Sequence, residues 1–468
     1  MSASSSSPRL GVSLPSGGRV RSLFRFRAGH LHLFMLGLAV VALPVLLPKG
    51  PGNTAPVDAL AVVYLLVALV GVTRRGRTLA RPAGGALLLM LAAAVVAMLA
   101  SEDVGLGLIT VMIEAYLILL LFGVANDLVD DPRALRVVMV VWLLAAVAWT
   151  FLPVGVALHL LPQELPVVGV QGARPAGTTG NPNLLGSYLV TSFFVLLASP
   201  WPRARLLRLL FGGWLLWGVW LTGSNGGISG LLVGFAVLGI GALFRRSRTR
   251  EQVFGLVGAL LLLGVALLVG SATLIQWQAG RNPIEMISQE TAGGPLGSTV
   301  GRADRGLQDR LQIWQQTWDE ASPHLVLGIG PGQLASLDVE SRTGVTRTSV
   351  HNDYLSALIE RGLLGLVAYL ALCAALARWC GRLLVAEGSG RATHRALAAA
   401  VWANLLFGVF HETYHFRHIW MLFALVWVAA HQLGAADRPD GEDGEPDEAG
   451  NAVAPAPAGR PEPSGAAT

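Results

Sequence analysis

Long apolar runs alternate with short polar segments along most of this chain. Runs of this length are typical of membrane-spanning helices, which need roughly 20 mainly apolar residues. The pattern predicts an all-α polytopic membrane protein with about 12 transmembrane helices and one large polar loop between the ninth and the tenth. The predicted spans are residues 31–47, 57–72, 84–100, 106–124, 136–158, 183–199, 206–222, 227–244, 252–274, 363–385, 395–410 and 416–433.

The composition agrees with a membrane protein, since 53% of the residues are hydrophobic and only 13% are charged. Basic residues gather in five short loops, and short cytoplasmic loops keep Arg and Lys. These loops and both termini are therefore expected in the cytoplasm, and the large loop, residues 275–350, outside it. The net charge of +5 is therefore attributed to the basic cytoplasmic loops, and no nucleic-acid partner is predicted. The basic loops are residues 74–81, 130–136, 202–208, 245–250 and 378–395.

The two ends of the chain differ from the apolar middle. Residues 1–28 are Ser-rich and then Arg-rich, with no small-residue cleavage site after the first apolar run, so we expect a disordered cytoplasmic leader before an uncleaved signal anchor. Residues 436–468 are acidic and Pro/Ala-rich and are predicted to be a disordered cytoplasmic tail. The transmembrane domain, with its outer loop, is predicted to cover residues 29–435. Cys373 and Cys380 are expected to be packing residues within one span.

The large loop is polar, basic and followed directly by His351. Thr348 and Ser349 are good helix caps, so we expect His351 in the first turn of the next helix. The positive end of that helix would lower the pKa of the imidazole and keep it neutral near pH 7, able to accept a proton. A histidine at the end of a span can also be structural, but arginines beside it indicate an anion held next to a base. These arginines are Arg281, Arg302, Arg305, Arg310, Arg342 and Arg347.

Two further segments expected on the outer face are rich in Gly and Asn. Residues 173–188 place Arg174 in a turn before a helix that begins at Pro182 or Asn183, where free backbone N–H groups suit a phosphate or a sugar. Residues 221–230 break two apolar runs with polar groups, which need partners at membrane depth. The first segment could equally be a simple re-entry loop, and the second a hairpin turn.

The middle of the outer loop is predicted to be an amphipathic helix, lying on the membrane surface or against the bundle. Its apolar residues recur at helical spacing, and Arg310 lies in its middle turns, where it could contact lipid headgroups or the anion. The sequence GIGPGQ that follows is predicted to be a turn, since it lacks the lysine and the strand of a nucleotide-binding loop. The apolar positions are Leu307, Leu311, Trp314 and Trp318.

Near the C-terminus, His411, Glu412 and His415 match the pattern H-E-x-x-H, which on a helix places two zinc ligands on one face. His418 could supply a third nitrogen. However, the match lies where a span is predicted to end, residues 414–417 are expected to form the turn, and no further acidic ligand is evident. We interpret these groups as the polar rim of an outer cavity, with a metalloprotease site as the alternative.

Five motifs occur in order: GTTGNPNLLG, LTGSNGG, RLQIW, LGIGPGQ and HNDYLSALIERGLLGL. With them the chain resembles the O-antigen ligase and O-antigen polymerase superfamily over about residues 170–385. The resemblance implies a GT-C-like glycosyltransferase of the bacterial cytoplasmic membrane, independent of metals and cofactors. It also implies a donor glycan linked to undecaprenyl diphosphate and a lipid or glycan acceptor.

Carried over by position, His351 resembles the catalytic histidine of the family and Arg310 the arginine that holds the diphosphate. Arg174 resembles another outer arginine near the donor. The chain departs from the family at Asn225, where an arginine is usual, so Arg174, Arg302 or Arg305 has to compensate, or the activity has diverged. We expect the substrate-binding contacts to come from Arg310, Arg174, Arg302, Arg305, Asn225, Asn183, Asn352 and Tyr354.

Other functions stay open at this point. The shared motifs do not separate a ligase from a polymerase or from a transferase that modifies protein. A transporter or flippase of lipid-linked glycans also accounts for the spans, but it predicts ionisable residues at mid-membrane, where Glu114 is the main example. We expect Glu114 to be buried and either neutral or paired. The Asn225 departure also keeps a non-catalytic envelope scaffold possible.

Overall fold

The computed structural model describes most of the predicted transmembrane domain and part of the outer loop. The predicted span 252–274, the leader, the tail after Ala436, Arg281, Arg302 and Arg342 lie outside the described residues. The described ranges are 31–49, 54–75, 78–162, 169–171, 174–243, 303–336, 338–341, 344–347, 350–386 and 394–436.

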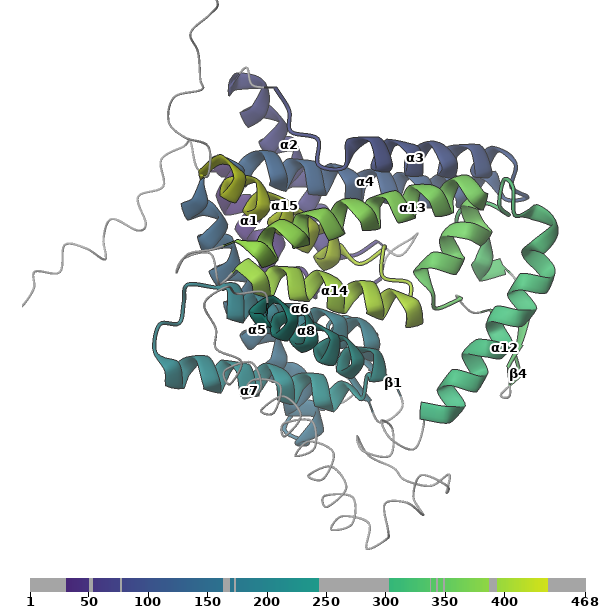
Figure 1. Ribbon diagram of the computed structural model, residues 1–468. Helices are drawn as coiled ribbons and strands as arrows, with labels where there is room; N and C mark the ends of the chain where they lie inside the picture. The colour runs from purple at the N-terminus through teal and green to yellow at the C-terminus, as the bar shows by residue number, and fades with distance from the viewer. Residues whose placement is uncertain are drawn as a thin grey trace, which may run out of the picture.

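The predicted spans that fall within the described ranges are all helices, packed as one bundle (Figure 1). Their bounds follow the predicted spans closely, with two exceptions. The first helix ends at Val41, before the predicted end at residue 47, and the helix that contains the predicted span 363–385 begins earlier, at Asp353. The helices are α1 Leu31–Val41, α2 Pro56–Arg75, α3 Gly84–Leu99, α4 Val104–Leu128, α5 Pro132–Ala157, α6 Pro182–Ala198, α7 Arg205–Thr222, α8 Asn225–Leu243, α13 Asp353–Val385, α14 Arg395–Phe410 and α15 Arg417–Ala436.

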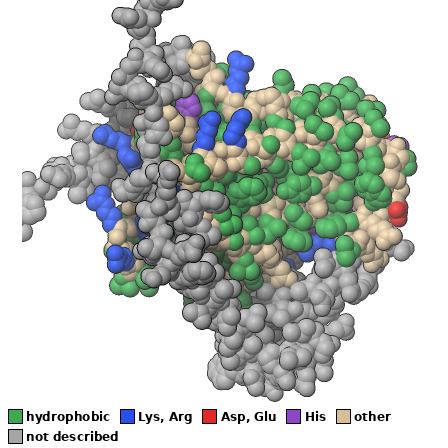
Figure 2. Space-filling view, viewed as in Figure 1, with side chains coloured by type: hydrophobic (Ala, Val, Ile, Leu, Met, Phe, Trp, Pro, Cys, Tyr) green, Lys and Arg blue, Asp and Glu red, His purple; other side chains and the backbone are tan. Residues whose placement is uncertain are grey.

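Three of the described helices, α4, α5 and α13, are long and apolar enough to cross a membrane. Figure 2 shows hydrophobic side chains covering much of the visible face, with Lys and Arg gathered toward the left. Large apolar side chains such as Leu88, Met112 and Leu209 are exposed, and a large exposed apolar surface indicates contact with lipid or another partner. Shorter apolar helices lie at Leu31–Val41, Pro56–Gly71, Gly84–Leu99, Pro182–Ala198, Asn225–Gly241 and Arg395–Phe410.

Polar residues at the helix starts explain where several helices begin. The side chains of Asp103 and Asp131 accept hydrogen bonds from the first free backbone N–H groups of α4 and α5. Asn181 does the same for α6, which begins at Pro182 as predicted. Proline in the first helical position also lacks the N–H that would have no partner there.

The centre of the bundle is α14, which packs between α6, α8 and α13. Its small residues allow the neighbouring backbones to approach closely, as is usual in membrane proteins. Asn404 of α14 donates to Oγ1 of Thr191 (2.9 Å) and accepts from Oγ of Ser187 (2.8 Å), both on α6. His418 of α15 lies 3.0 Å from the same Ser187 hydroxyl. These buried hydrogen bonds join the three helices α6, α14 and α15.

The described part of the outer loop contains α12 Ala303–Ala321, which lies across one end of the bundle (Figure 1). The predicted amphipathic helix is thus confirmed, but its apolar stripe is divided between two faces. Trp314 donates its indole N–H to the backbone oxygen of Val350 (2.8 Å), whereas Leu311 and Trp318 are exposed. Short elements complete the loops: η3 Ser322–His324, η4 Gln333–Ser336, the hairpin of β3 Asp338–Ser341 with β4 Gly344–Arg347, and the hairpin of β1 Gly169–Gln171 with β2 Arg174–Gly177.

Helix α13 is broken at Gly362, where φ is 66° and ψ is −167°. The apolar run begins directly after the break, at Leu363, so residues 353–361 form a separate helical segment before the predicted span. The backbone groups freed by the break bond to the loop after α12. Ile329 N–H donates to the oxygen of Ile359 (2.9 Å), and Leu363 N–H donates to the oxygen of Leu325 (2.9 Å). The sequence GIGPGQ is therefore a turn, as predicted, and it packs against the break.

We expect Gly362→Ala to destabilise the protein. Only glycine readily adopts this backbone conformation, and forcing another residue into it costs about 1–3 kcal/mol. A Cβ there would also clash with the backbone oxygen of Val326. The thermal unfolding midpoint of the purified variant in detergent is expected to fall. Gly381→Ala is the matched control, since a Cβ at Gly381 of the same helix meets nothing within 4 Å. Equal midpoints for the two variants would show that the break is not required.

Candidate active site

His351 lies just before α13 and not within its first turn, as the sequence had suggested. The helix begins at Asp353, and the side chain that caps it is Asn352, which accepts hydrogen bonds from the N–H groups of Tyr354 (2.9 Å) and Leu355 (3.0 Å). His351 itself has a φ of 52°, which is rare for a residue with a side chain. The cap predicted at Thr348 or Ser349 is wrong because Asn352 competes for the same role and is closer to the helix.

Burial and the charge of Arg310 lower the pKa of His351 to about 4. The imidazole is therefore neutral near pH 7, as predicted, but the cause is different. Its neutrality comes from desolvation and a neighbouring cation, because the ring lies outside the helix whose dipole had been expected to act on it. A neutral imidazole in this position can accept a proton.

Arg310 of α12 lies near His351 and beside His411. Its Nη2 lies 3.5 Å from Nε2 of His411, the residue that ends α14, and its guanidinium lies 5.9 Å from the centre of the Phe410 ring. The rings of His351 and His411 meet edge to face, with centroids 5.6 Å apart. Phe407 stacks on the other side of His411 at 4.7 Å. Three side chains thus lie together: Arg310 of α12, His351 just before α13, and His411 at the end of α14.

Arg174, in β2, joins two of the predicted segments. Its Nε donates to the backbone oxygen of Thr222 (2.7 Å) and its Nη2 donates to Oδ1 of Asn183 (2.8 Å). The segment at 221–230 contains the end of α7, a tight turn at Gly223 and Ser224, and the start of α8, and Thr222 and Ser224 are fully buried. The segment thus contains the tight turn that was one alternative, and its polar groups are also packed inside the bundle, which was the other.

The turn between α7 and α8 also touches the histidine pair. A Cβ at Gly226 would lie 3.3 Å from Cδ2 of His411, so the start of α8 directly contacts that ring. Asn225, the first residue of α8, is partly exposed beside it. Burial, followed by the charges of Arg310, His351 and Arg174, holds the pKa of His411 well below its usual value. The predicted clusters at 173–188, 221–230 and His351 therefore meet at one end of the bundle.

Some predicted site residues have other contacts or lie outside this description. Asn352 uses its side chain to cap α13, and the hydroxyl of Tyr354 donates to the backbone oxygen of Leu405 (3.2 Å) in α14. Arg302 lies outside the described residues, and Arg305 is part of α12 with its side chain outside the description. The structure thus brings Arg310, Arg174, Asn183 and Asn225 toward His351, and turns Asn352 and Tyr354 to internal contacts.

The sequence HETYH does not lie on a helix. It occupies the turn between α14 and α15, and its two histidines have separate surroundings. His411 faces Arg310 and His351, whereas burial and the charges of Arg361 and Arg417 lower the pKa of His415 to about 3. The one-face geometry of a helical zinc motif is therefore absent from this turn. His411, interpreted from the sequence as part of a polar rim, instead belongs to the centre of the candidate site.

The turn at 411–416 is fixed to the first segment of α13. The carboxylate of Asp353 accepts hydrogen bonds from the N–H of Thr413 (2.6 Å) and of Tyr414 (3.2 Å), and from the hydroxyl of Thr413. Tyr414 in turn donates its hydroxyl to Glu360 (3.2 Å). The motifs HNDYL and HETYH, about 60 residues apart in sequence, are thus one hydrogen-bonded unit.

Deeper in the bundle, Arg361 pairs with Glu114 of α4 and with Glu360 (3.0 Å), and all three side chains are buried. Glu114 is therefore buried and paired, as predicted. Arg361 also lies over the ring of Tyr414, 4.9 Å from its centre. Ionisable groups inside the bundle are expected of a transporter. Here Arg361 pairs with two carboxylates, and both Arg361 and Glu360 contact Tyr414 of the turn at 411–416.

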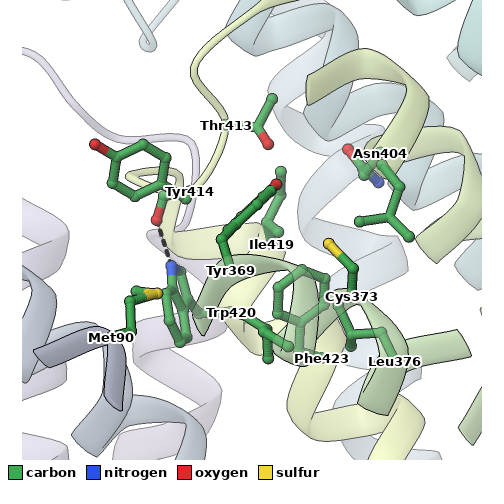
Figure 3. A pocket seen from close by; sticks show the side chains of 12 residues that line it. Met90, Tyr369, Cys373, Leu376, Asn404, Thr413, Tyr414, Ile419, Trp420 and Phe423 are labelled. Carbon is green, nitrogen blue, oxygen red and sulfur yellow. Dashed lines mark hydrogen bonds between the residues drawn. The ribbon is translucent and has the colours of Figure 1, made fainter. Parts of the chain in front are cut away.

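A small cavity lies behind this turn, and Figure 3 shows the side chains that line it. They include Tyr369 and Cys373 of α13, Asn404 of α14 and Trp420 of α15, whose indole N–H donates to the backbone oxygen of Tyr414. The cavity volume of about 10 Å³ has room for one water molecule. A glycan cannot bind there. His351 and Arg310, by contrast, are partly exposed.

Comparison with known proteins agrees with this picture. Residues 188–370 match the protein-family model described as O-antigen ligase. No curated protein matched the chain. The matched range runs from α6 into α13 and contains Arg310 and His351, while His411 and Glu412 lie beyond it. The chain therefore carries an O-antigen ligase domain at residues 188–370, which confirms the resemblance to the O-antigen ligase and O-antigen polymerase superfamily and supports a bacterial membrane glycosyltransferase of that type.

Proposed function

We propose that this protein is an inverting, metal-independent glycosyltransferase that moves a glycan from undecaprenyl diphosphate to an acceptor hydroxyl. The observation that carries the proposal is the convergence of a neutral, partly exposed His351 with the Arg310 guanidinium at one end of the bundle. A base and a cation are what this reaction needs, because a sugar on a diphosphate already has a good leaving group.

In the proposed reaction, His351 takes the proton of the acceptor hydroxyl. The hydroxyl oxygen forms a bond to the anomeric carbon as the bond from that carbon to the diphosphate oxygen breaks. Undecaprenyl diphosphate leaves with the electron pair, and attack from the opposite face inverts the configuration. Arg310 stabilises the developing charge, since its guanidinium binds two phosphate oxygens at once and stays charged.

Other residues are proposed to complete the donor site. Arg174 and Asn183, hydrogen-bonded to each other, would contact the diphosphate or the first sugar, with Arg302 and Arg305 of the outer loop adding positive charge. Asn225 can form a hydrogen bond but carries no charge, so Arg174, whose Nε donates to the backbone oxygen of Thr222 close to Asn225 in sequence, is proposed to compensate for the missing arginine. Asn352 and Tyr354 would act by holding the start of α13.

The proposal also includes the topology. The chain is placed in the bacterial inner membrane with about 12 spans, counting the shorter apolar helices and residues 252–274. Both termini are placed in the cytoplasm, and the site at the outer surface. Within the described residues, His411 and the turn between α7 and α8, which lie near His351, belong to helix ends that the charge pattern assigns to that surface, and this supports the orientation.

The proposal is tested by incubating purified protein with an undecaprenyl-diphosphate glycan and a panel of acceptors in EDTA, and following free undecaprenyl diphosphate. Release that needs one acceptor is the expected result. Release with a lipid core would indicate a ligase, and release with a second lipid-linked repeat a polymerase. Protein that binds the donor but releases nothing with any acceptor would contradict the proposal and favour transport or scaffolding.

Arg310→Ala is expected to lower kcat/KM for glycan transfer by about 10²–10³-fold, the usual effect of losing one group that stabilises developing charge. Arg310→Lys should recover only part of the loss, because lysine binds phosphate as a point charge. Initial rates over a range of donor concentrations measure both effects. Arg205→Ala, at an exposed arginine of α7, is the control. Full activity of the Arg310→Ala protein would remove Arg310 from the site.

A further inference from the structure

We propose that His411 is a positioning residue of this active site, which holds the Arg310 guanidinium in place through Nε2 of its imidazole. This inference rests on the proposed function, in which Arg310 stabilises the departing diphosphate. It assigns a role to a residue outside the range of the family match, which ends at residue 370. The sequence alone places His411 in a polar rim or in a zinc motif, and neither interpretation gives it this role.

The contact between Arg310 and His411 defines which atom of the ring is used. Nη2 of Arg310 lies 3.5 Å from Nε2 of His411. A guanidinium has only donors, so the imidazole nitrogen has to accept, which requires a neutral ring with its proton on Nδ1. The pKa of His411 is held well below its usual value, first by burial and then by the charge of Arg310, so the ring is neutral near pH 7.

The His411 ring is itself held by groups that do not depend on Arg310. Phe407 of α14 stacks on it, with ring centroids 4.7 Å apart and planes inclined by 28°. The start of α8 lies beside it, since a Cβ at Gly226 would come within 3.3 Å of its Cδ2. The residue is buried. An arginine side chain has many rotamers, so an acceptor fixed in this way restricts the guanidinium to few of them.

The end of α14 contacts the guanidinium at a second point and also contacts the base. The guanidinium carbon of Arg310 lies 5.9 Å from the centre of the Phe410 ring, within the range of cation–π attraction. The rings of His411 and His351 meet edge to face at 5.6 Å. Arg310 belongs to the outer loop, whereas His411 ends a helix at the centre of the bundle. His411 therefore contacts both the proposed cation and the proposed base, and fixes one relative to the other.

A ring that only filled the space between Phe407 and the start of α8 would behave differently from one that holds Arg310. The amide oxygen of glutamine is as many bonds from Cα as Nε2 of histidine, so it can accept a hydrogen bond at the same place. The amide oxygen of asparagine is one bond closer and takes the place of Nδ1. Positioning therefore predicts that His411→Gln keeps activity and His411→Asn does not. Space filling predicts equal losses, because neither side chain has a ring.

The test is steady-state glycan transfer over a range of donor concentration by purified wild type, His411→Ala, Arg310→Ala and the double variant. We expect His411→Ala to lower kcat/KM by about 10- to 100-fold, the effect of misplacing a catalytic group. The double variant should lose no more than Arg310→Ala alone, within about twofold, because a residue that acts through Arg310 then has nothing to hold. His411→Gln should keep most of the wild-type activity, and His411→Asn should resemble His411→Ala.

His431→Ala, at an exposed histidine of α15, is the control and should behave as wild type. If His411→Ala does not fold, His411→Gln and His411→Asn are compared instead, each with and without Arg310→Ala. With an active wild type, losses that multiply in the double variant, or equal activities of the Gln and Asn variants, would overturn the positioning role alone. A wild type that transfers nothing would overturn the proposed function, and this inference with it.

Discussion

Replacing His351 with alanine is expected to abolish most of the glycan transfer, lowering kcat by about 10²–10⁴-fold, the range that a positioned general base contributes. The loss should fall on kcat more than on KM for the donor, because Arg310 and Arg174 remain in place. The measurement is acceptor-dependent release of undecaprenyl diphosphate by purified variant and wild type. His324→Ala, at an exposed histidine of the outer loop, should behave as wild type.

The pH dependence of wild type provides a second readout of the same prediction. Because the folded environment lowers the pKa of His351 to about 4, the proton-accepting form persists well below the ordinary pKa of histidine, about 6.5. Wild-type kcat/KM, which reports groups of the free enzyme, should therefore stay level from neutral pH to near pH 5 and decline only as the pH falls through about 4. An acid limb of kcat/KM near pH 6.5, or His351→Ala protein with undiminished kcat, would contradict the role of His351 as a base whose pKa is lowered by its surroundings.

The helices were largely predictable because their signals are local. An apolar run of span length needs no tertiary information, and a proline preceded by an asparagine predicted the start of α6 at Pro182. The amphipathic spacing in the outer loop likewise predicted α12. The face of α12 that packs against the bundle could not be predicted, because it depends on the shape of the surface that the helix contacts.

The candidate site was only partly predictable because it is built from segments that are distant in sequence. Arg310 and His351 could be proposed from residue type and from resemblance. His411 and Glu412 were predicted only as the polar rim of an outer cavity, because nothing local shows that the turn after α14 packs against the start of α13. Asp353 makes that contact through the backbone of Thr413 and Tyr414, which leaves no pattern in the sequence.

The start of α13 and its break could not be predicted from the local sequence either. Thr348 and Ser349 are good caps in isolation, but Asn352 caps the helix and leaves His351 outside it. The break at Gly362 was also hidden, because a glycine after an arginine has no distinctive local meaning. Its role becomes visible only when the loop at 325–332 is seen bonded to the backbone on both sides of the break.

The largest effect on stability is expected from Arg361→Ala. Arg361 is buried and pairs with both Glu114 and Glu360. Its removal leaves two buried carboxylates without their cation, and breaking a buried pair in this way costs about 3–5 kcal/mol. The ring of Tyr414 loses its cation as well. We expect a strongly lowered unfolding midpoint in detergent, or failure to obtain folded protein, measured by fluorescence-detected size-exclusion chromatography after heating.

Glu114→Ala separates the charge effect from simple loss of packing. In that variant Arg361 keeps Glu360 as a partner at 3.0 Å, so the midpoint should fall less than in Arg361→Ala. The pair Glu114→Leu with Arg361→Met should be more stable than Arg361→Ala alone, because apolar residues of similar size can replace a buried ion pair with little loss. Since Tyr414 and Glu360 connect this pair to the turn that carries His411 and Glu412, a loss of stability here should also reduce transfer. An Arg361→Ala protein with a wild-type midpoint would show that the buried charges are solvated by water and do not hold α4, α13 and the turn together.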